Sequence, residues 1–482
     1  MKLGLISLGC DKNTVDSERI LARLTAHGAE LVQDPGEAEV IVVNTCGFID
    51  AAKQESIDTI LDAARLKEEG RCRALVAVGC LVERHREALA RELPEVDLLL
   101  GLRDLDRLIP DLQRRGVLGS RQLHPGERLP LGSHGHVRYL KVSEGCDHGC
   151  AFCAIPLWRG RHRSFHSDQL VAEAKRLEAQ GAVELNLVAQ DLAHYGRDRR
   201  DGTDITSLLR RLLDETDVPW IRLLYIYSAG LREPLVRLMA SEGRVMPYID
   251  MPIQHASDAV LERMRRPERR DSLRRKVAWL RESVPGVTLR TTVLVGFPGE
   301  TDADFRTLVD FLEEARFDRL GAFAFSPQEG TRALSLQASP VPESLARARL
   351  AELREVQRAI SAERSAAEIG AERAAIVADG AGSTDPALGR LASQADDVDG
   401  VTWLEAAEPL SPGQIVKAVV TGAEDFDLRA RVVGVLRPAP AIGAVPFEGS
   451  AAAVHGNGSS RTRRGARPLP MAPLGLETAW GR

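Results

Sequence analysis

Alternating strand-like and helix-like segments limit the fold of this 482-residue chain more than any other feature. In the first hundred residues, three short apolar runs stand at 2–8, 39–43 and 74–78. Each is followed by a helix-like stretch, at 16–26, 51–66 and 83–91. Strands that alternate with helices form parallel sheets. Residues 1–118 are therefore predicted to form a parallel α/β domain.

A cysteine follows each of these three runs, at Cys10, Cys46 and Cys80. The carboxyl ends of parallel strands share one edge of the sheet, and ligands bind there. One such cysteine could be a small apolar residue, but three in the same position of successive units predict a metal or cluster site. Cys72 precedes its strand, so we interpret it as an ordinary thiol.

A second set, Cys146, Cys150 and Cys153, has the compact spacing C-x3-C-x2-C. Structural zinc normally takes four ligands from paired motifs. Here no second pair follows, and His148 lies inside the loop, where it is poorly placed as a fourth ligand. Three thiolates on a four-iron cluster leave one iron without a protein ligand. An open metal position can bind a small molecule, so we expect a cluster with an open iron.

With the aromatic Phe152 before its last cysteine, this motif resembles the radical S-adenosylmethionine (SAM) superfamily. The upstream cysteines make the chain similar to the methylthiotransferases of that superfamily, over roughly residues 1–435. The resemblance implies SAM and two [4Fe-4S] clusters as cofactors. The implied metal ligands are Cys10, Cys46 and Cys80 for one cluster and Cys146, Cys150 and Cys153 for the other.

After a polar linker at 119–136, six strand-like runs recur with helices between them up to residue 340. Six are too few for a closed eightfold barrel, and the resemblance implies an open, partial (βα)6 barrel. It also implies cofactor contacts from Phe152, Gln190, Asp191, Gly296 and Glu300, while catalytic residues stay unknown. The Gly296 segment could equally be an ordinary turn.

A long charged helix is predicted at 341–369, followed by a small OB-like β-barrel at 370–436, which the resemblance implies is a TRAM domain. The segment 368–436 holds twelve acidic and five basic residues. RNA backbones require Lys and Arg, so we expect this domain to attract a basic protein. The predicted docking residues are Asp396, Asp397, Asp399, Glu424, Asp425 and Asp427. The Gly- and Pro-rich segment 437–482 is predicted to be a disordered tail.

Two branches of the family differ in substrate: one modifies an adenosine in tRNA, the other the β-carbon of an aspartate in small-subunit ribosomal protein S twelve. Residues 9–18 read GCDKNTVDSE, which is similar to the ribosomal-protein branch; the tRNA branch has Gln-Met-Asn at this place. Segments 143–148 and 248–255 agree. The resemblance thus implies 3-methylthioaspartate as product. A sulfur donor and an electron donor, such as flavodoxin or ferredoxin, are the implied partners.

Three alternatives stay open: a tRNA methylthiotransferase, a non-catalytic iron–sulfur electron carrier, and a zinc-stabilised RNA-binding module. The net charge of −5 carries no global signature for nucleic acid. Seven cysteines, an odd and small number, favour a reducing compartment over a disulfide framework. Apolar runs are strand-sized, and the one at 3–8 is shorter than a signal core. We therefore expect a cytoplasmic enzyme that does not bind membranes.

Overall fold

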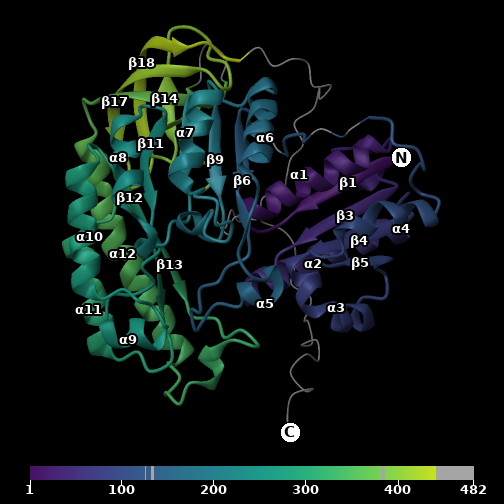
Figure 1. Ribbon diagram of the computed structural model, residues 1–482, viewed down its shortest axis with the longest axis horizontal. Helices are drawn as coiled ribbons and strands as arrows, with labels where there is room; N and C mark the ends of the chain where they lie inside the picture. Colours follow the sequence, from purple (N-terminus) through teal and green to yellow (C-terminus); the bar gives the residue numbers. More distant parts are fainter. Residues whose placement is uncertain (125, 127, 132–134, 381–385, 441–482) are drawn as a thin grey trace.

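The computed structural model describes residues 1–482 except 125, 127, 132–134, 381–385 and 441–482. Its three β-sheet units follow one another along the chain, and Figure 1 shows the amino-terminal unit beside the other two. The predicted tail lies outside the described residues from 441 onward, as does part of the predicted linker.

The first unit is a five-stranded parallel sheet in the order β2-β1-β3-β4-β5. Its strands are β1 (Lys2–Ser7), β2 (Glu30–Leu31), β3 (Val40–Thr45), β4 (Ala74–Gly79) and β5 (Leu98–Leu100). Its helices are α1 (Asp11–Ala26), α2 (Asp50–Glu69), α3 (Cys80–Glu92) and α4 (Leu108–Arg114). Successive strand residues point to opposite faces, so Val42 packs with α1 and α4, and Val43 with α2 and α3. The predicted parallel α/β domain is confirmed.

The second unit is an open six-stranded parallel sheet in the order β13-β12-β11-β10-β9-β6. Its strands are β6 (Val137–Lys141), β9 (Glu184–Val188), β10 (Trp220–Leu223), β11 (Val245–Asp250), β12 (Thr288–Val295) and β13 (Arg319–Ala324). Its helices are α6 (Ser167–Ala179), α7 (Ile205–Glu215), α8 (Glu233–Ser241), α9 (Asp258–Arg263), α10 (Arg270–Ser283) and α11 (Asp302–Ala315). The largest apolar core lies between the sheet and these helices. The predicted six-stranded partial barrel is confirmed.

A short antiparallel pair, β7 (Ser143–Glu144) and β8 (Arg163–Ser164), closes the loop that carries the second set of cysteines. Within this loop lies the one-turn helix α5 (Ile155–Arg159). The pair therefore fixes both ends of the cysteine loop beside β6.

The long helix α12 (Glu343–Ala367) packs along β13 and leads to the third unit. This unit is a closed barrel in the order β14-β15-β16-β18-β17. Its strands are β14 (Glu372–Asp379), β15 (Ala387–Leu391), β16 (Thr402–Glu405), β17 (Ile415–Ala423) and β18 (Leu428–Arg437). The predicted small β-barrel is confirmed, and it is called the terminal barrel below.

The terminal barrel is docked on the six-stranded sheet by apolar and ionic contacts. Ile376 and Ile415 share an apolar cluster with Tyr248 of β11. Beside them the fully buried Glu184 accepts from Arg222 at 2.7 Å and from Arg390 of the terminal barrel at 2.7 Å. A buried carboxylate between two guanidinium groups is paired on both oxygens, so it joins the two units.

The predicted acidic docking surface is wrong for two of its six members. Asp396 is only 6% exposed and pairs with Arg390 at 3.0 Å. Asp399 accepts from the Tyr248 hydroxyl at 2.7 Å. Both carboxylates therefore stabilise the terminal barrel and its contact with the sheet. The exposed acidic residues of this unit include Asp379, Glu405 and Glu408.

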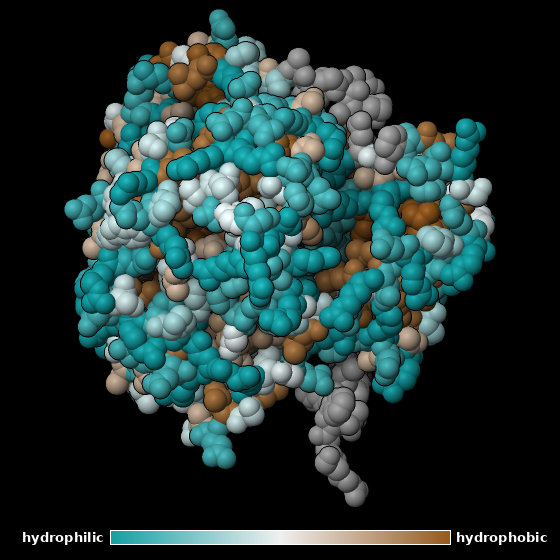
Figure 2. Space-filling view, in the orientation of Figure 1, coloured by the Kyte–Doolittle hydropathy of each residue, from teal (hydrophilic) through white to brown (hydrophobic). Residues whose placement is uncertain are grey.

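The face shown in Figure 2 is mostly hydrophilic, with apolar side chains in small separate areas. Among the helices of the described residues, none combines the length and the apolar character needed to cross a membrane.

Candidate functional site

The three cysteines of the amino-terminal domain stand at one edge of its sheet. Cys10 follows the end of β1, Cys46 directly follows β3, and Cys80 begins α3 directly after β4. These are neighbouring strands, because β3 pairs with both β1 and β4. Gly9 has a φ of +94°, and a Cβ there would lie 2.9 Å from the sulfur of Cys46. The structure therefore brings together the three cysteines that the pattern predicted to converge.

These thiols are suited to a metal rather than to free reactivity. Burial, together with the neighbouring Cys10, raises the pKa of Cys46 to about 12. Burial raises the pKa of Cys80 to about 11, although the Arg159 guanidinium opposes the shift. Such thiols do not ionise alone at neutral pH, but coordination to a metal deprotonates them. Soft sulfur donors are the ligands that iron–sulfur clusters take.

Asn13, in the first turn of α1, holds the loops of this triad in place. Its side-chain nitrogen donates to the carbonyl of Leu8 at 2.9 Å and to the carbonyl of Thr45 at 3.1 Å. Its side-chain oxygen accepts from Arg159 at 2.6 Å. One buried amide thus fixes the segments before Cys10 and Cys46, which gives the triad a rigid frame.

The second triad lies in the loop from β7 to α5. Gly145 has a φ of +78°, and a Cβ there would lie 2.2 Å from the carbonyl oxygen of Arg161. The amide of Cys146 donates to the carbonyl of Gly160 at 3.1 Å, and that of Ala151 to the carbonyl of Met264 at 2.9 Å. Burial raises the pKa of Cys146 to about 11 and that of Cys153 to about 12, and the neighbouring Cys150 adds to both shifts.

Neither triad forms a compact single-ion site among the described residues. Within the described residues, one group of three His, Cys, Asp or Glu ligand atoms lies within 4.8 Å of one another, and it contains no cysteine. Thiolates that bind one zinc ion, each at about 2.3 Å from it, lie closer to one another than that limit. A four-iron cluster holds its cysteines farther apart, because each binds a different iron.

The two triads are adjacent in space although about seventy residues separate them in the chain. Cys80 packs against Ala154 and Trp158, and Ala154 directly follows Cys153. Arg159 then reaches back from the second loop and donates to the sulfur of Cys80 at 3.2 Å. Groups bound at the two triads would therefore face a common space.

Arg159 is also part of a buried ionic network that joins the two domains. It pairs with Asp16 of α1 at 3.3 Å and with Glu144 of β7 at 2.9 Å. Lys141 of β6 pairs with the same two carboxylates. The two carboxylates and the two cationic side chains form ion pairs with one another, and such pairing compensates for their burial away from water. The network fixes the amino-terminal domain against the cysteine loop.

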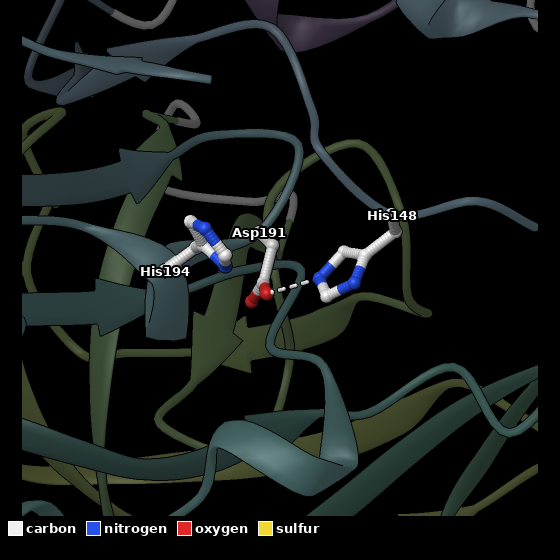
Figure 3. Close-up of side chains that lie close together, drawn as sticks. All are labelled: His148, Asp191 and His194. Atoms are coloured by element: carbon white, nitrogen blue, oxygen red, sulfur yellow. Dashed lines mark hydrogen bonds and ion pairs between the residues drawn. The ribbon is translucent and has the colours of Figure 1, made fainter. Parts of the chain in front are cut away.

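In the described part of the chain, the compact group of potential metal ligands is His148, Asp191 and His194, shown in Figure 3. His148 points toward Asp191, with its Nε2 2.7 Å from a carboxylate oxygen, and stacks on Tyr227 with ring centroids 4.0 Å apart. The other oxygen of Asp191 accepts from the amides of Ala193 at 3.0 Å and Tyr227 at 3.1 Å. Through these hydrogen bonds, Asp191 connects the cysteine loop to the segments that follow β9 and β10.

The residues predicted to contact the cofactor fall into two groups. Gln190, which donates to Glu144 at 3.1 Å, lies near the cysteine loop, and Phe152 packs with Phe297. By contrast, both carboxylate oxygens of Asp191 and both of Glu300 accept hydrogen bonds from the protein. The carboxylate of Glu300 accepts from the amide of Gly296 at 2.6 Å and from Arg349 at 2.9 Å. Contacts between these five residues and SAM stay predictions.

Sequence reasoning missed three residues of this site: Asn13, Arg159 as a link between domains, and Lys12. Asn13 and Lys12 stand in the segment 9–18 that indicates the family branch, but no periodicity assigns them a role. Tyr225, after β10, has a φ of +67° although it is not a glycine. Such strained backbone concentrates at functional sites, but it is visible only in the structure.

Three family models match the chain: Uncharacterized protein family UPF0004 at residues 2–101, the Radical SAM superfamily at 140–312, and the TRAM domain at 369–433. Together they cover the three units of the fold.

Curated relatives match nearly the whole chain. The ribosomal protein uS12 methylthiotransferase RimO of Desulforudis audaxviator is 44% identical over 90% of this chain and 98% of its own length. That of Anaeromyxobacter sp. strain K is 46% identical over 97% of this chain and 95% of its own length. Among solved structures, the radical SAM methyltransferase TsrM from Kitasatospora setae is 16% identical, with a TM-score of 0.48 over 67% of this chain and 73% of its own.

Proposed function

The chain belongs to the RimO family of radical SAM methylthiotransferases, and we propose that it adds a methylthio group to the β-carbon of an aspartate in ribosomal protein uS12. As a member of this family it uses SAM and [4Fe-4S] clusters. When bound, these cofactors supply a radical able to remove hydrogen from an unactivated carbon, chemistry that amino-acid side chains lack.

We assign the ligands of two clusters to the two cysteine triads. Cys146, Cys150 and Cys153 would hold the cluster that binds SAM, and Cys10, Cys46 and Cys80 the cluster that serves sulfur insertion. Support comes from the donor set, the raised pKa values of the buried thiols and the lack of a compact single-ion site among the described cysteines.

The adjacency of the two triads is the observation that carries the proposal. One carbon of the substrate must lose a hydrogen and then gain a sulfur, so both sites must reach the same carbon. The packing of Cys80 against Ala154, next to Cys153, supports this requirement. An electron carrier with two independent clusters does not need this arrangement, nor does it need a partial barrel.

The protein's own groups position and protect this site. The contact between His148 and Asp191 holds the loop of the second triad, and the hydrogen bond from Arg159 to Cys80 connects that loop to the first triad. Hydrogen bonds to ligand sulfurs and burial are the levers by which a protein tunes a cluster. The Gly296 loop, fixed by Glu300, lies beside Phe152 and would contact SAM through its backbone.

We further propose that the exposed acidic residues of the terminal barrel attract uS12, because ribosomal proteins are basic where they meet RNA. A small electron carrier of the flavodoxin or ferredoxin type and a sulfur donor would complete the reaction. Since ribosomal proteins are made in the cytoplasm, the enzyme would act there.

The test is mass spectrometry of uS12 after incubation with the anaerobically reconstituted enzyme, SAM, a reductant and sulfide. We expect a methylthio group on one aspartate, and none when Cys10, Cys46 and Cys80 are replaced together by alanine. Cys72→Ala is the matched control, because Cys72 is buried in the apolar cluster between the sheet and α2 and donates to the carbonyl of Ala74. A methylthio group on tRNA adenosine, with none on uS12, would refute the proposal.

A further inference from the structure

One buried cation near the first triad lacks the partner that every comparable cation has. In the described part of the chain, eight lysines and arginines are buried, and Lys12, 7% exposed, is the one that forms no ion pair. The other seven each contact a carboxylate; they are Arg138, Lys141, Arg159, Arg222, Arg266, Arg349 and Arg390. Buried charges are normally paired, because desolvation is costly. Lys12 therefore has an unused capacity to bind an anion.

The surroundings of Lys12 place this capacity at the junction of the two domains. Lys12 stands two residues after Cys10, in the first turn of α1. Its ammonium nitrogen lies 3.0 Å from the centroid of the Tyr225 ring, which belongs to the segment after β10. An aromatic face stabilises a cation without neutralising it. The cation is thus held in position and remains able to pair with a carboxylate.

The two acidic side chains nearest Lys12 are committed elsewhere. Asp11 accepts a hydrogen bond from the Tyr225 hydroxyl at 2.9 Å. Asp250 pairs with Arg290 at 2.8 Å and accepts from the Tyr225 amide at 3.1 Å. The remaining anionic neighbour is the Cys10 thiol, which the proposed cluster would occupy, so a substrate carboxylate is the partner that Lys12 can still take. Cys10, beside it, is exposed, so the site is open to a substrate.

We propose that Lys12 binds the side-chain carboxylate of the aspartate that is modified; this inference rests on the proposed function. The carboxylate is bonded directly to the β-carbon that receives the sulfur. The group that holds this carboxylate must therefore lie close to the site that delivers the sulfur, and Lys12 stands two residues after Cys10 in the chain. The pairing selects aspartate over neutral side chains and presents its β-carbon between the two triads.

The experiment is a double-mutant cycle on binding, with the anaerobically reconstituted enzyme and fluorescently labelled uS12. The enzyme is tested as wild type and as Lys12→Met, which keeps the length of the side chain and removes its charge. The substrate is tested as wild type and with its target aspartate replaced by asparagine. Lys2→Met is the matched control, because Lys2 is exposed in the same domain and pairs with Glu37 at 2.9 Å. Iron content reports whether each variant is correctly folded and loaded.

We expect Lys12→Met to raise the Kd for wild-type uS12 by roughly tenfold to a hundredfold, the range for a hydrogen bond to a charged group. The asparagine form of uS12 should bind wild type and Lys12→Met equally, and Lys2→Met should bind both forms of uS12 as wild type does. Equal binding of both uS12 forms by the wild-type enzyme would overturn the inference, even if Lys12→Met did not fold.

Two other results would also overturn it. If Lys12→Met raised the Kd of SAM, or lowered sulfur insertion without changing uS12 binding, the anion at Lys12 would be SAM or the sulfur donor. Failure of the proposed function is distinguishable from these, because the wild-type enzyme would then leave uS12 unmodified in the mass-spectrometric assay.

Discussion

Replacing Glu184 by glutamine is expected to loosen the terminal barrel from the six-stranded sheet. Glu184 is fully buried and pairs with Arg222 and Arg390, each at 2.7 Å. Glutamine keeps the shape of the side chain but leaves the two guanidinium groups without their shared countercharge. Removing one partner of a buried ionic contact costs roughly 3–5 kcal/mol. Since 1 kcal/mol shifts Tm by about 2–4 °C in a unit of this size, Tm should fall by roughly 6–20 °C.

The pH dependence of this contact gives a second readout. Burial alone would raise the pKa of Glu184, but the guanidinium groups of Arg390 and Arg222 hold it below its ordinary value of 4.5. A carboxylate with a lowered pKa stabilises the folded state above its ordinary value, and this stabilisation is lost as the pH falls. Wild type should therefore lose stability below a pH of about 4.5 more steeply than Glu184→Gln.

The assay is thermal unfolding of the iron-free protein, followed by tryptophan fluorescence across a pH series. Trp220, beside Glu184 at the start of β10, lies in the apolar cluster that contacts the terminal barrel. Glu215→Gln is the matched control, because its pairs with Lys175 and Arg211 are at the surface and should contribute little. Equal Tm values for the two variants at neutral pH would refute the role given to Glu184.

Three further predictions concern the clusters and the substrate. The reconstituted protein should hold about eight irons, and replacing all three cysteines of either triad by alanine should leave about four, while Cys72→Ala changes neither iron content nor activity. Asp191→Ala removes the acceptor for His148 and for two backbone amides, so the second cluster should lose iron faster on desalting, whereas the exposed Asp201→Ala should not change the rate. Reversing the exposed Asp379, Glu405 and Glu408 to lysine should slow uS12 association at low salt and have little effect at high salt; an unchanged association rate would remove the terminal barrel from substrate capture.

Local patterns in the sequence were enough to predict the architecture. Strand and helix periods identified all three sheet units, and in the amino-terminal domain the ends of β1, β3 and β4 were placed within a few residues. Strands β2, β5, β7 and β8 were missed because two or three residues are too few to show a period. Convergence of Cys10, Cys46 and Cys80 followed from topology alone, because parallel strands must end at one edge. The compact spacing of the second triad likewise needs no tertiary information, since eight residues can form one loop.

Tertiary structure alone decided which charges meet. Asp191 and Glu300 were predicted to contact the cofactor, which stays a prediction, and the structure adds that their carboxylates also accept from His148 and Arg349. Asp396 was predicted to face a partner protein, but it pairs with Arg390. Lys12 shows the converse, a buried cation for which the fold supplies no countercharge. Periodicity reports which face of an element is buried, whereas a charge finds its partner across domains that are far apart in the chain. Its role is therefore set by distances that only the packed structure defines.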